Sequence, residues 1–310
     1  MSLVLSVISF RSSASNAISL HQLNDSVYFV QGKNQPLIPN QALVVGQRCA
    51  LLASIHGDLV ATEALISILQ SQFSVPLCYA VSLHSDIKQD TSIALLQHAF
   101  PKLVWLSPTK TSGDKLQQAF AAQLALFEQS IDLSKTRVST LDKDQQGAWQ
   151  EKLTIAKQRV ASWSERITHF RSSETLDTHN TSLNLGEVEV NIANFTGFTG
   201  SDLTIYLPHS QGLIGGYNVD LVPLVHRKHW QQWQQALQTL RSRPLSWVLP
   251  ATGKPYKPNM LSIPDKFLTL LNQTKEQQVI EKITTLYSNK QQQQRAISQW
   301  QHIQQQTDFE

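Results

Sequence analysis

Short apolar runs in the first part of the chain predict strands, interrupted by one helix. Residues 26–32 and 41–54 are rich in Val, Tyr, Phe and Leu and are separated by Gly, Asn and Pro, which is typical of strands in a hairpin-rich sheet. Asp58 then predicts a helix N-cap, since apolar residues follow it on one helical face: Ala61, Leu65, Ile68 and Leu69. The continuous apolar run 75–83 predicts a buried strand.

Helical patterns dominate the middle of the chain. A helix over 91–100 and a strand over 102–107 are expected first. Residues 114–171 then predict a helical hairpin inserted between strands. Each of its helices carries one apolar stripe, formed by Leu116, Phe120, Leu124 and Phe127 in the first and by Trp149, Leu153, Val160, Trp163, Ile167 and Phe170 in the second.

Strand patterns return in the second half. They cover 176–195, 201–208, 211–219 and 245–255, and an amphipathic helix built on Trp230, Trp233, Leu237 and Leu240 precedes the last of them. The order of sheet, helix, sheet and helix predicts an α+β fold. We expect a four-layer αββα sandwich, with two sheets packed face to face, helices outside and the hairpin as an insertion.

The chain ends are the least regular parts. We expect one domain over 18–310, closed by a glutamine-rich C-terminal helix over 275–310, because Ile297, Trp300 and Ile303 keep a helical stripe there. Residues 1–17 are either a signal peptide or an N-terminal strand. An apolar run and a small-residue segment favour the signal peptide, whereas the missing basic start and Arg11 behind the run favour the strand.

Composition narrows the classes of function. The 310 residues are 41% hydrophobic and 16% charged, which is enough apolar material for a large core. The net charge is +3, but the basic residues are scattered, so we expect no nucleic-acid binding. No apolar run reaches the roughly 18 residues of a membrane span. Cys49 and Cys78 are expected as buried core residues; the alternative is a disulfide between neighbouring strands, which requires an oxidising compartment.

Candidate chemistry is concentrated in "VSLHSDIKQD", residues 81–90. His84, Asp86, Lys88 and Asp90 follow the end of a predicted strand, where loops of αβ layers commonly carry functional residues. These four are the candidate catalytic residues. The alternatives are a hydrogen-bonded His84 and Asp86 pair that supports a loop, a weak site for a metal other than zinc, and a ligand-binding site.

Four further residues are candidates for ligand binding. His56 lies near a turn, Gly215 and Gly216 form either a tight turn or a close approach to a ligand, and Thr252 follows the last predicted strand. His226 and His229 are expected at a solvated helix start rather than in an anion site. No nucleophile elbow, phosphate-binding loop or dinucleotide fingerprint occurs in the sequence.

Several segments in this order resemble the metallo-β-lactamase superfamily, and more narrowly the periplasmic zinc metallohydrolases of quinoprotein relay systems. The resemblance spans roughly residues 23 to 255 and rests on "GQRCALLASIHGDLVATEAL", "PLCYAVSLHSD", "LNLGEVEV", "TGFTGSDLTIYLP", "PLVHRKHWQQWQQAL" and "VLPATGKP". It implies the αββα fold predicted above. It also implies a T-H-x-H-x-D-H loop that binds zinc and activates water.

The zinc ligands of that family are largely replaced in this chain. Only His84 matches the loop, because the other three ligand positions hold Asp86, Lys88 and Gln89. The positions of the later ligands hold Phe198, Gly215 or Gly216, and Thr252, and the acidic turn of the family holds Ala53. Asp202 matches an aspartate that is not a ligand. We expect Lys88 to stand near the vacated position as a cation that neutralises Asp86 and Asp90.

The resemblance and its gaps together imply a catalytically degenerate protein. We expect no cofactor, zinc included, and a protein partner or small ligand bound through the old site mouth and the helical hairpin. By resemblance, the partner is a quinoprotein dehydrogenase or cytochrome and the compartment is the periplasm, with the cytoplasm as the alternative. The alternative function is a hydrolase with a rebuilt site around His84, Asp86 and Lys88.

Overall fold

The structure is a computed structural model that describes residues 18–32, 38–176, 181–225, 230–273 and 275–307. Residues 1–17, interpreted as a signal peptide or a strand, lie outside this described part, as do His226 and His229. Within it, no helix is both long enough and apolar enough to span a bilayer.

The first sheet has seven strands in sequence order, from β1 to β7. Strands β1 to β4 pair antiparallel, and β4 to β7 pair parallel. The strands are β1 (Ile18–Asn24), β2 (Val27–Gly32), β3 (Gln41–Val45), β4 (Ala50–Ala53), β5 (Leu77–Val81), β6 (Val104–Ser107) and β7 (Glu174–Thr175). The parallel part places the ends of β4, β5 and β6 at one edge, where the loops after them can meet.

The second sheet has five strands in the order β12, β11, β10, β9 and β8. Strands β11 and β12 pair parallel, and the other neighbours pair antiparallel. The strands are β8 (Thr181–Asn184), β9 (Glu189–Phe195), β10 (Asp202–Leu207), β11 (Gly212–Gly216) and β12 (Trp247–Pro250). Backbone hydrogen bonds also join the sheets, since Asn40 donates to the carbonyl of Ala251 at 2.7 Å.

Strands buried on both faces explain the continuous apolar runs of the sequence. In β4, Leu51 and Ala53 face the second sheet, where they join a cluster with Ile205 and Ile214, while Ala50 and Leu52 pack under helices. Because both faces of such a strand are covered, its sequence does not alternate. The result is the four-layer αββα sandwich that the sequence predicts.

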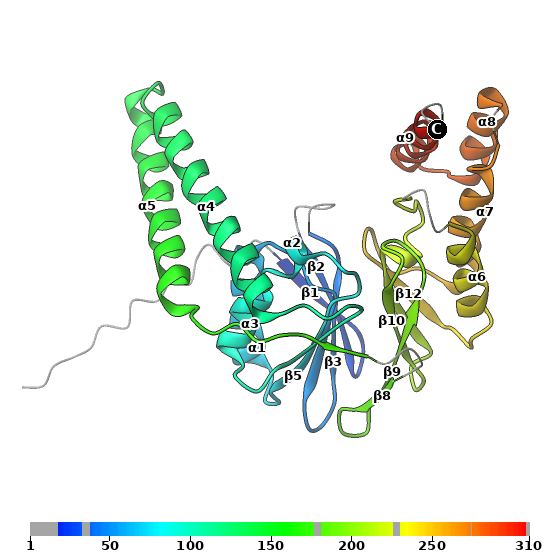
Figure 1. The fold of residues 1–310 in the computed structure, drawn as a ribbon, viewed down its shortest axis with the longest axis horizontal. Coiled ribbons are helices and arrows are strands. Elements are labelled where there is room, and N and C mark those ends of the chain that lie inside the picture. The colour runs from blue at the N-terminus through cyan, green and yellow to red at the C-terminus, as the bar shows by residue number, and fades with distance from the viewer. Residues whose placement is uncertain (1–17, 33–37, 177–180, 226–229, 274, 308–310) are drawn as a thin grey trace, which may run out of the picture.

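Helices cover both outer faces (Figure 1). Helices α1 (Leu59–Gln72) and α3 (Ile93–Ala99) pack on the first sheet, with the single-turn helix α2 (Ile87–Asp90) at its edge. Asp58 caps α1, as predicted, by accepting from the N–H of Ala61 at 2.8 Å. Helices α6 (Trp230–Arg241) and α7 (Ser262–Leu270) pack on the second sheet, which is also contacted by the short 3-10 helices η2 (Tyr217–Val219) and η3 (Pro258–Leu261).

The helical hairpin consists of α4 (Gly113–Val138) and α5 (Lys143–Arg166) and rises away from the sandwich (Figure 1). Its base packs on α1 and α3 through residues such as Phe120 and Trp163, and Glu63 of α1 accepts from the Trp163 indole at 2.6 Å. The expected second stripe is only partly buried, because Trp149 is 44% exposed. Within the described part of the chain, the hairpin tip projects beyond the sandwich (Figure 1).

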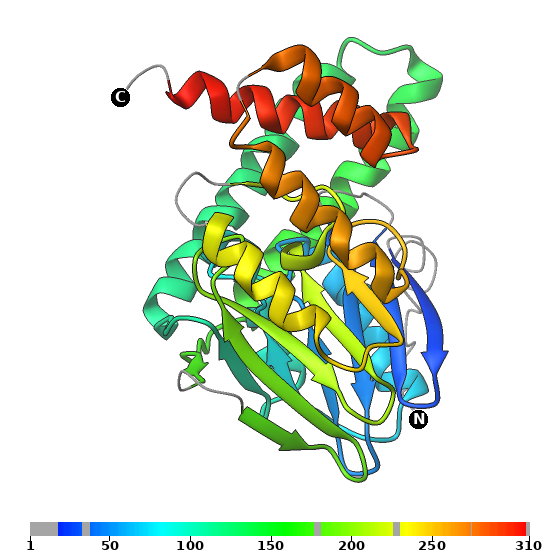
Figure 2. The ribbon, with the colours of Figure 1, turned by 90° about the vertical axis from the view of Figure 1, so that its right-hand side faces the viewer.

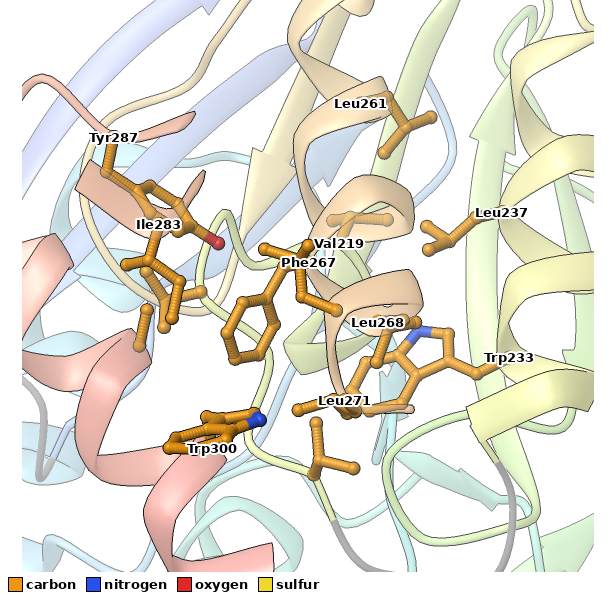
Figure 3. Packing of buried hydrophobic residues seen from close by; sticks show 14 of the residues in the cluster. Val219, Trp233, Leu237, Leu261, Phe267, Leu268, Leu271, Ile283, Tyr287 and Trp300 are labelled. Carbon is orange, nitrogen blue, oxygen red and sulfur yellow. The ribbon is translucent and has the colours of Figure 1, made fainter. Parts of the chain in front are cut away.

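The glutamine-rich end, expected as one helix over 275–310, contains two: α8 (Glu276–Leu286) and α9 (Lys290–Thr307). They lie across the same end of the sandwich from which the hairpin rises (Figure 2). Trp300 of α9 belongs to a buried cluster that includes Phe267 of α7 and Tyr287 (Figure 3). The exposed glutamines therefore sit on a helix with an apolar face that is fully docked.

The two cysteines lie beside neighbouring strands, and both are free thiols. Cys49 directly precedes β4 and is buried, and Cys78 lies in β5 and is half-buried. Burial, reinforced by the neighbouring Cys78, raises the pKa of Cys49 to about 12. Cys49 is therefore a small apolar residue of the inner core, as expected, whereas Cys78, expected to be buried, is half-buried and packs against that core.

Replacement of Trp300 tests how firmly α9 is docked. We expect Trp300→Ala to lower the free energy of unfolding by roughly 3–5 kcal/mol, the range for a buried aromatic truncated to alanine. The change removes a buried indole that donates to the carbonyl of Gln273 at 3.0 Å. Urea denaturation provides the measurement. Ser298→Ala, at an exposed position of the same helix, is the matched control and should change stability by less than about 0.5 kcal/mol. Equal effects of the two substitutions would contradict the docking.

Candidate functional site

The candidate cluster lies where the sequence places it, in the segment that follows β5. Asp86 is the N-cap of α2, and its carboxylate accepts a hydrogen bond from the backbone N–H of Lys88 at 3.0 Å. This bond satisfies one of the N–H groups that a helix start leaves unpaired. Asp86 therefore starts α2 and is not directed at His84.

His84 connects the two sheets just beyond their strand ends. Its buried imidazole has Nδ1 at 3.2 Å from Oδ1 of Asp202, the first residue of β10. The backbone N–H of Tyr217 donates to Nε2 at 3.5 Å. Because Nε2 accepts, Nδ1 carries the proton and donates to Asp202. The expected pairing of His84 with Asp86 is therefore wrong, and both ring nitrogens are engaged within the protein.

Asp202 is held in place from several directions. It is completely buried, and its carboxylate accepts from both the backbone N–H and the hydroxyl of Thr199, the latter at 2.6 Å. Next to it, the N–H of Leu203 donates to the carbonyl of Leu83 at 2.8 Å, which joins the sheets through their backbones. These bonds fix the imidazole in one orientation, in accordance with the structural role expected for this aspartate.

Two aromatic rings fill the space beside the imidazole. The ring centroid of Phe198 lies 5.4 Å from that of His84 in an edge-to-face arrangement, and the ring of Tyr217 lies 4.9 Å away. The two rings also contact each other, with centroids 4.9 Å apart. Phe198 therefore places an apolar ring, which offers no metal donor, against the imidazole.

The backbone of Gly216 lies directly beside the imidazole of His84. A Cβ built at this glycine would lie 2.9 Å from Nε2 of His84, and φ is +55°, a conformation that favours glycine. Gly215 packs against Val219 instead, because a Cβ there would lie 2.5 Å from that side chain. The structure thus brings the backbone of Gly216 to His84, with no side chain between them.

A second polar cluster forms around Thr252. The backbone N–H and hydroxyl of Thr252 donate to the carboxylate of Asp220 at 2.9 and 2.8 Å. Arg295 of α9 donates to the Thr252 hydroxyl at 3.3 Å and lies 3.7 Å from Asp220. Burial raises the pKa of Asp220 to about 7 against the opposing effect of these donors.

Sequence reasoning selected Thr252 but missed Asp220 and Arg295. The only signal for Asp220 is an aspartate at the end of the apolar run "LIGGYNVD", and Arg295 lies in a glutamine-rich stretch far along the chain. Their meeting depends on how α9 docks. Thr252, expected as a ligand-binding candidate, is therefore tied to the C-terminal helix.

Asp90 points into the core rather than into the site. It is buried, and its carboxylate accepts from the hydroxyl of Ser82 at 2.5 Å, which in turn accepts from the Trp105 indole at 2.9 Å. Burial raises the pKa of Asp90 from 3.8 to about 8. The carboxyl is therefore kept neutral by protonation, not by a cation.

Lys88 does not neutralise either aspartate. Its side chain is exposed, and no ion pair joins it to Asp86 or Asp90, both of which belong to the described part of the chain. Gln89 is half-buried beside it on α2. The expectation that Lys88 neutralises Asp86 and Asp90 is therefore wrong, because its side chain is exposed and pairs with neither.

His56 forms part of the turn before α1. Its Nδ1 accepts from the N–H of Asp58 at 3.2 Å, and its buried Nε2 has no hydrogen-bond partner among the described residues. Burial lowers the pKa of His56 to about 4, so the ring is neutral near pH 7. Gln123 of α4 donates to the carbonyl of Gly57, which fastens the hairpin to this turn.

The residues around His84 do not fit a zinc ion. Zinc requires three or four nitrogen, sulfur or oxygen donors at roughly 2.0 to 2.3 Å. Among the residues that the structure describes, no three His, Cys, Asp or Glu side chains are grouped so that they could hold a metal. The lone pair of His84 Nε2 already accepts the Tyr217 N–H, and Phe198 and Gly216 supply no donor.

The raised pKa of Asp90 predicts a pH dependence of stability. Because the native carboxyl keeps its proton up to about pH 8 and the unfolded one loses it near 3.8, the stabilisation is complete at low pH and decreases as pH rises between these values. Its slope is about 1.4 kcal/mol per pH unit. Asp90→Asn, which retains an acceptor for Ser82, should lack this decrease.

Urea denaturation of both proteins between about pH 5 and pH 7 measures this difference, with Asp25→Asn at an exposed turn as the control. Parallel profiles of the native protein and Asp90→Asn would show that the native carboxyl is ionised.

Known proteins provide an independent comparison. No protein-family model matches the sequence, and no curated protein matches it. The fold is similar to that of a metallo-β-lactamase from Pontibacter korlensis, with a TM-score of 0.54 and 16% identity, covering 83% of this chain and 100% of that one. It is also similar to the metallo-β-lactamase FIM-1 from Pseudomonas aeruginosa in its mono-zinc form, with a TM-score of 0.51 and 14% identity over 81% and 95% of the two chains. At such low identity the likeness establishes the fold alone: this chain has the metallo-β-lactamase fold.

Proposed function

We propose that this protein is a non-hydrolytic binding protein built on the metallo-β-lactamase fold. The observation that carries the proposal is the engagement of both nitrogens of His84 by Asp202 and the Tyr217 N–H. A histidine in that state can neither bind a metal nor take a proton from water without breaking an internal bond. The rings of Phe198 and Tyr217 also exclude water from its side.

The alternative, a hydrolase rebuilt around His84, Asp86 and Lys88, has less support. The three side chains do not converge, since His84 contacts Asp202, Asp86 caps α2 and Lys88 is exposed. General acid–base catalysis needs its groups within about 2.6–3.2 Å of the proton they transfer. Neither nitrogen of His84 is open for proton exchange with a substrate, because Asp202 and the Tyr217 N–H already occupy them.

The helical hairpin is the best-supported contact surface for a protein partner. Among the described residues, the large apolar side chains with high exposure are Leu126, Leu133 and Trp149, with exposed fractions of 65%, 56% and 44%, and all three lie on the hairpin. Exposed apolar surface concentrated on one projecting element is typical of interaction sites. The sandwich, by contrast, keeps its large apolar side chains covered.

The partner that we propose follows from the resemblance to quinoprotein relay metallohydrolases. It is a quinoprotein dehydrogenase or a cytochrome, and the compartment is the periplasm. The cytoplasm is the alternative compartment, because residues 1–17 are compatible with either a signal peptide or an N-terminal strand. Mass spectrometry of the mature N-terminus tests this choice directly.

Zinc content provides the first test of the proposed function. Protein incubated with zinc and then separated from free metal should retain far less than one equivalent, and esterase, thioesterase and lactamase substrates should not be turned over above the blank. The reason is that Phe198 and Gly216 stand where donors are needed. A near-stoichiometric zinc content, or turnover abolished by Asp86→Ala, would overturn the proposal.

Capture of the partner provides the second test. The native chain should recover a quinoprotein dehydrogenase or a cytochrome from a periplasmic extract, identified by mass spectrometry. Leu133→Asp combined with Trp149→Asp should reduce this recovery at least tenfold, because it places charge on the apolar contact surface. Glu128→Lys, an exposed charge change on the same hairpin, is the control. Recovery of neither protein class, or equal recovery with the double variant, would contradict the partner assignment.

A further inference from the structure

A cleft of about 810 Å³ opens between α2 and the first half of α4. Its wall is built from residues 85–88, Thr91, residues 109–111 and one face of α4 between Lys115 and Leu126. The volume lies within the range of roughly 300–1,000 Å³ that small-molecule sites occupy. The His84 cluster does not line this cleft, so the two are separate features.

Internal hydrogen bonds preform the walls of the cleft. The hydroxyls of Ser85 and Thr109 lie 2.8 Å apart and link the two loops at its edge. The Thr91 hydroxyl donates to the carbonyl of Lys88 at 3.1 Å. Gln123 of α4 donates to the carbonyl of Gly57 and so holds the hairpin against this side of the sandwich. A preformed cleft requires little ordering when a ligand binds.

The charge of the cleft favours an anion. Three lysines line it, Lys88, Lys110 and Lys115, and all three are exposed. Within the described part of the chain, no ion pair or side-chain hydrogen bond engages their ammonium groups. The acid of the wall, Asp86, already accepts the Lys88 backbone N–H. Three cations against one engaged carboxylate leave the cleft positive, which attracts a negatively charged group.

The remaining surface of the cleft is largely apolar. Ile87 lies on the α2 side, and Ala119, Ala122 and Leu126 follow one another along α4. The small alanine side chains leave room for a ligand. Leu126 is 65% exposed, and a ligand in the cleft would cover part of its apolar surface. Covering apolar surface stabilises a complex by about 25 cal/mol per Å². An ion without a hydrocarbon part would leave this surface in water.

We infer that the cleft between α2 and α4 binds a small amphipathic organic anion, whose anionic head lies among Lys88, Lys110 and Lys115 and whose hydrocarbon part lies along the alanine face of α4. This inference rests on the proposed binding function and specifies a ligand class for it. The anion uses the cleft at the hairpin base, to which Leu126 belongs, and the protein partner is left with Leu133 and Trp149, which lie outside it.

Decanoate provides a matched probe, with decan-1-ol as its uncharged analogue. The full chain should bind decanoate saturably, measured by displacement of the fluorescent anion 1-anilinonaphthalene-8-sulfonate, and should bind decan-1-ol at least tenfold more weakly. Lys88→Gln combined with Lys115→Gln should weaken decanoate binding at least tenfold. Lys257→Gln combined with Lys266→Gln makes the same change in charge at exposed positions outside the cleft and should leave the affinity within about twofold of the native value.

A second variant tests whether decanoate binding depends on the open volume of the cleft as well as on its charge. Ala122→Trp introduces an indole at an exposed position of α4 that lines the cleft, so the helix should fold while the cleft is filled. We expect it to abolish decanoate binding with all three lysines in place. Absence of saturable binding by the native chain, or equal binding by the two lysine pairs, would overturn the inference. The zinc and turnover measurements test the proposed function independently of decanoate binding. Either the proposed function or the ligand class of the cleft can therefore fail without the other.

Discussion

The polar junction at the strand ends is the constraint on which the rest of the structure depends. The two sheets pack through apolar side chains along most of their length, but at this edge they meet through His84, Asp202 and the Tyr217 N–H. The backbone bond from Leu203 to Leu83 reinforces the same junction. Buried polar groups are costly when left unpaired, and at this edge His84, Asp202 and the Tyr217 N–H are paired with one another. The buried Nδ2 of Asn218 and Nε2 of His56 have no hydrogen-bond partner among the described residues. The His84 imidazole, used in this way, becomes a structural part of the sandwich.

The space around His84 is filled by its neighbours. Phe198 and Tyr217 lie beside the imidazole, and Gly216 lets the backbone approach it closely. Thr252 has Asp220 and Arg295 as partners, so the C-terminal helix contacts the end of the second sheet at this point. Protein interiors are close-packed. This region is likewise filled and connected rather than left open.

The surface features with binding potential lie on the helical hairpin. Its base forms one wall of the basic cleft, and its tip carries Leu133 and Trp149. The hairpin is fastened to the sandwich by Gln123 at Gly57 and by Trp163 at Glu63, so a ligand or partner on it acts on a fixed surface. In this arrangement the inserted element carries these surface features, and the sandwich supplies the stable scaffold.

The sequence by itself determined the layered αββα architecture. Apolar runs such as 75–83 and the stripes of the two long helices are local patterns, and burial of their apolar faces leaves few arrangements other than helices outside two sheets. Local chemistry also fixed the Asp58 cap, and residue type alone shows that Phe198 and Gly216 offer no side-chain metal donor. Only the tertiary structure decided the partners of the polar groups. Asp202 at His84, Arg295 at Thr252 and Ser82 at Asp90 depend on how separate elements pack, and the direction of a side chain such as Lys88 or Trp149 depends on where the covering surface ends. Periodicity tells which face of an element is buried, whereas the contact that buries a polar atom is set by residues far away in the chain.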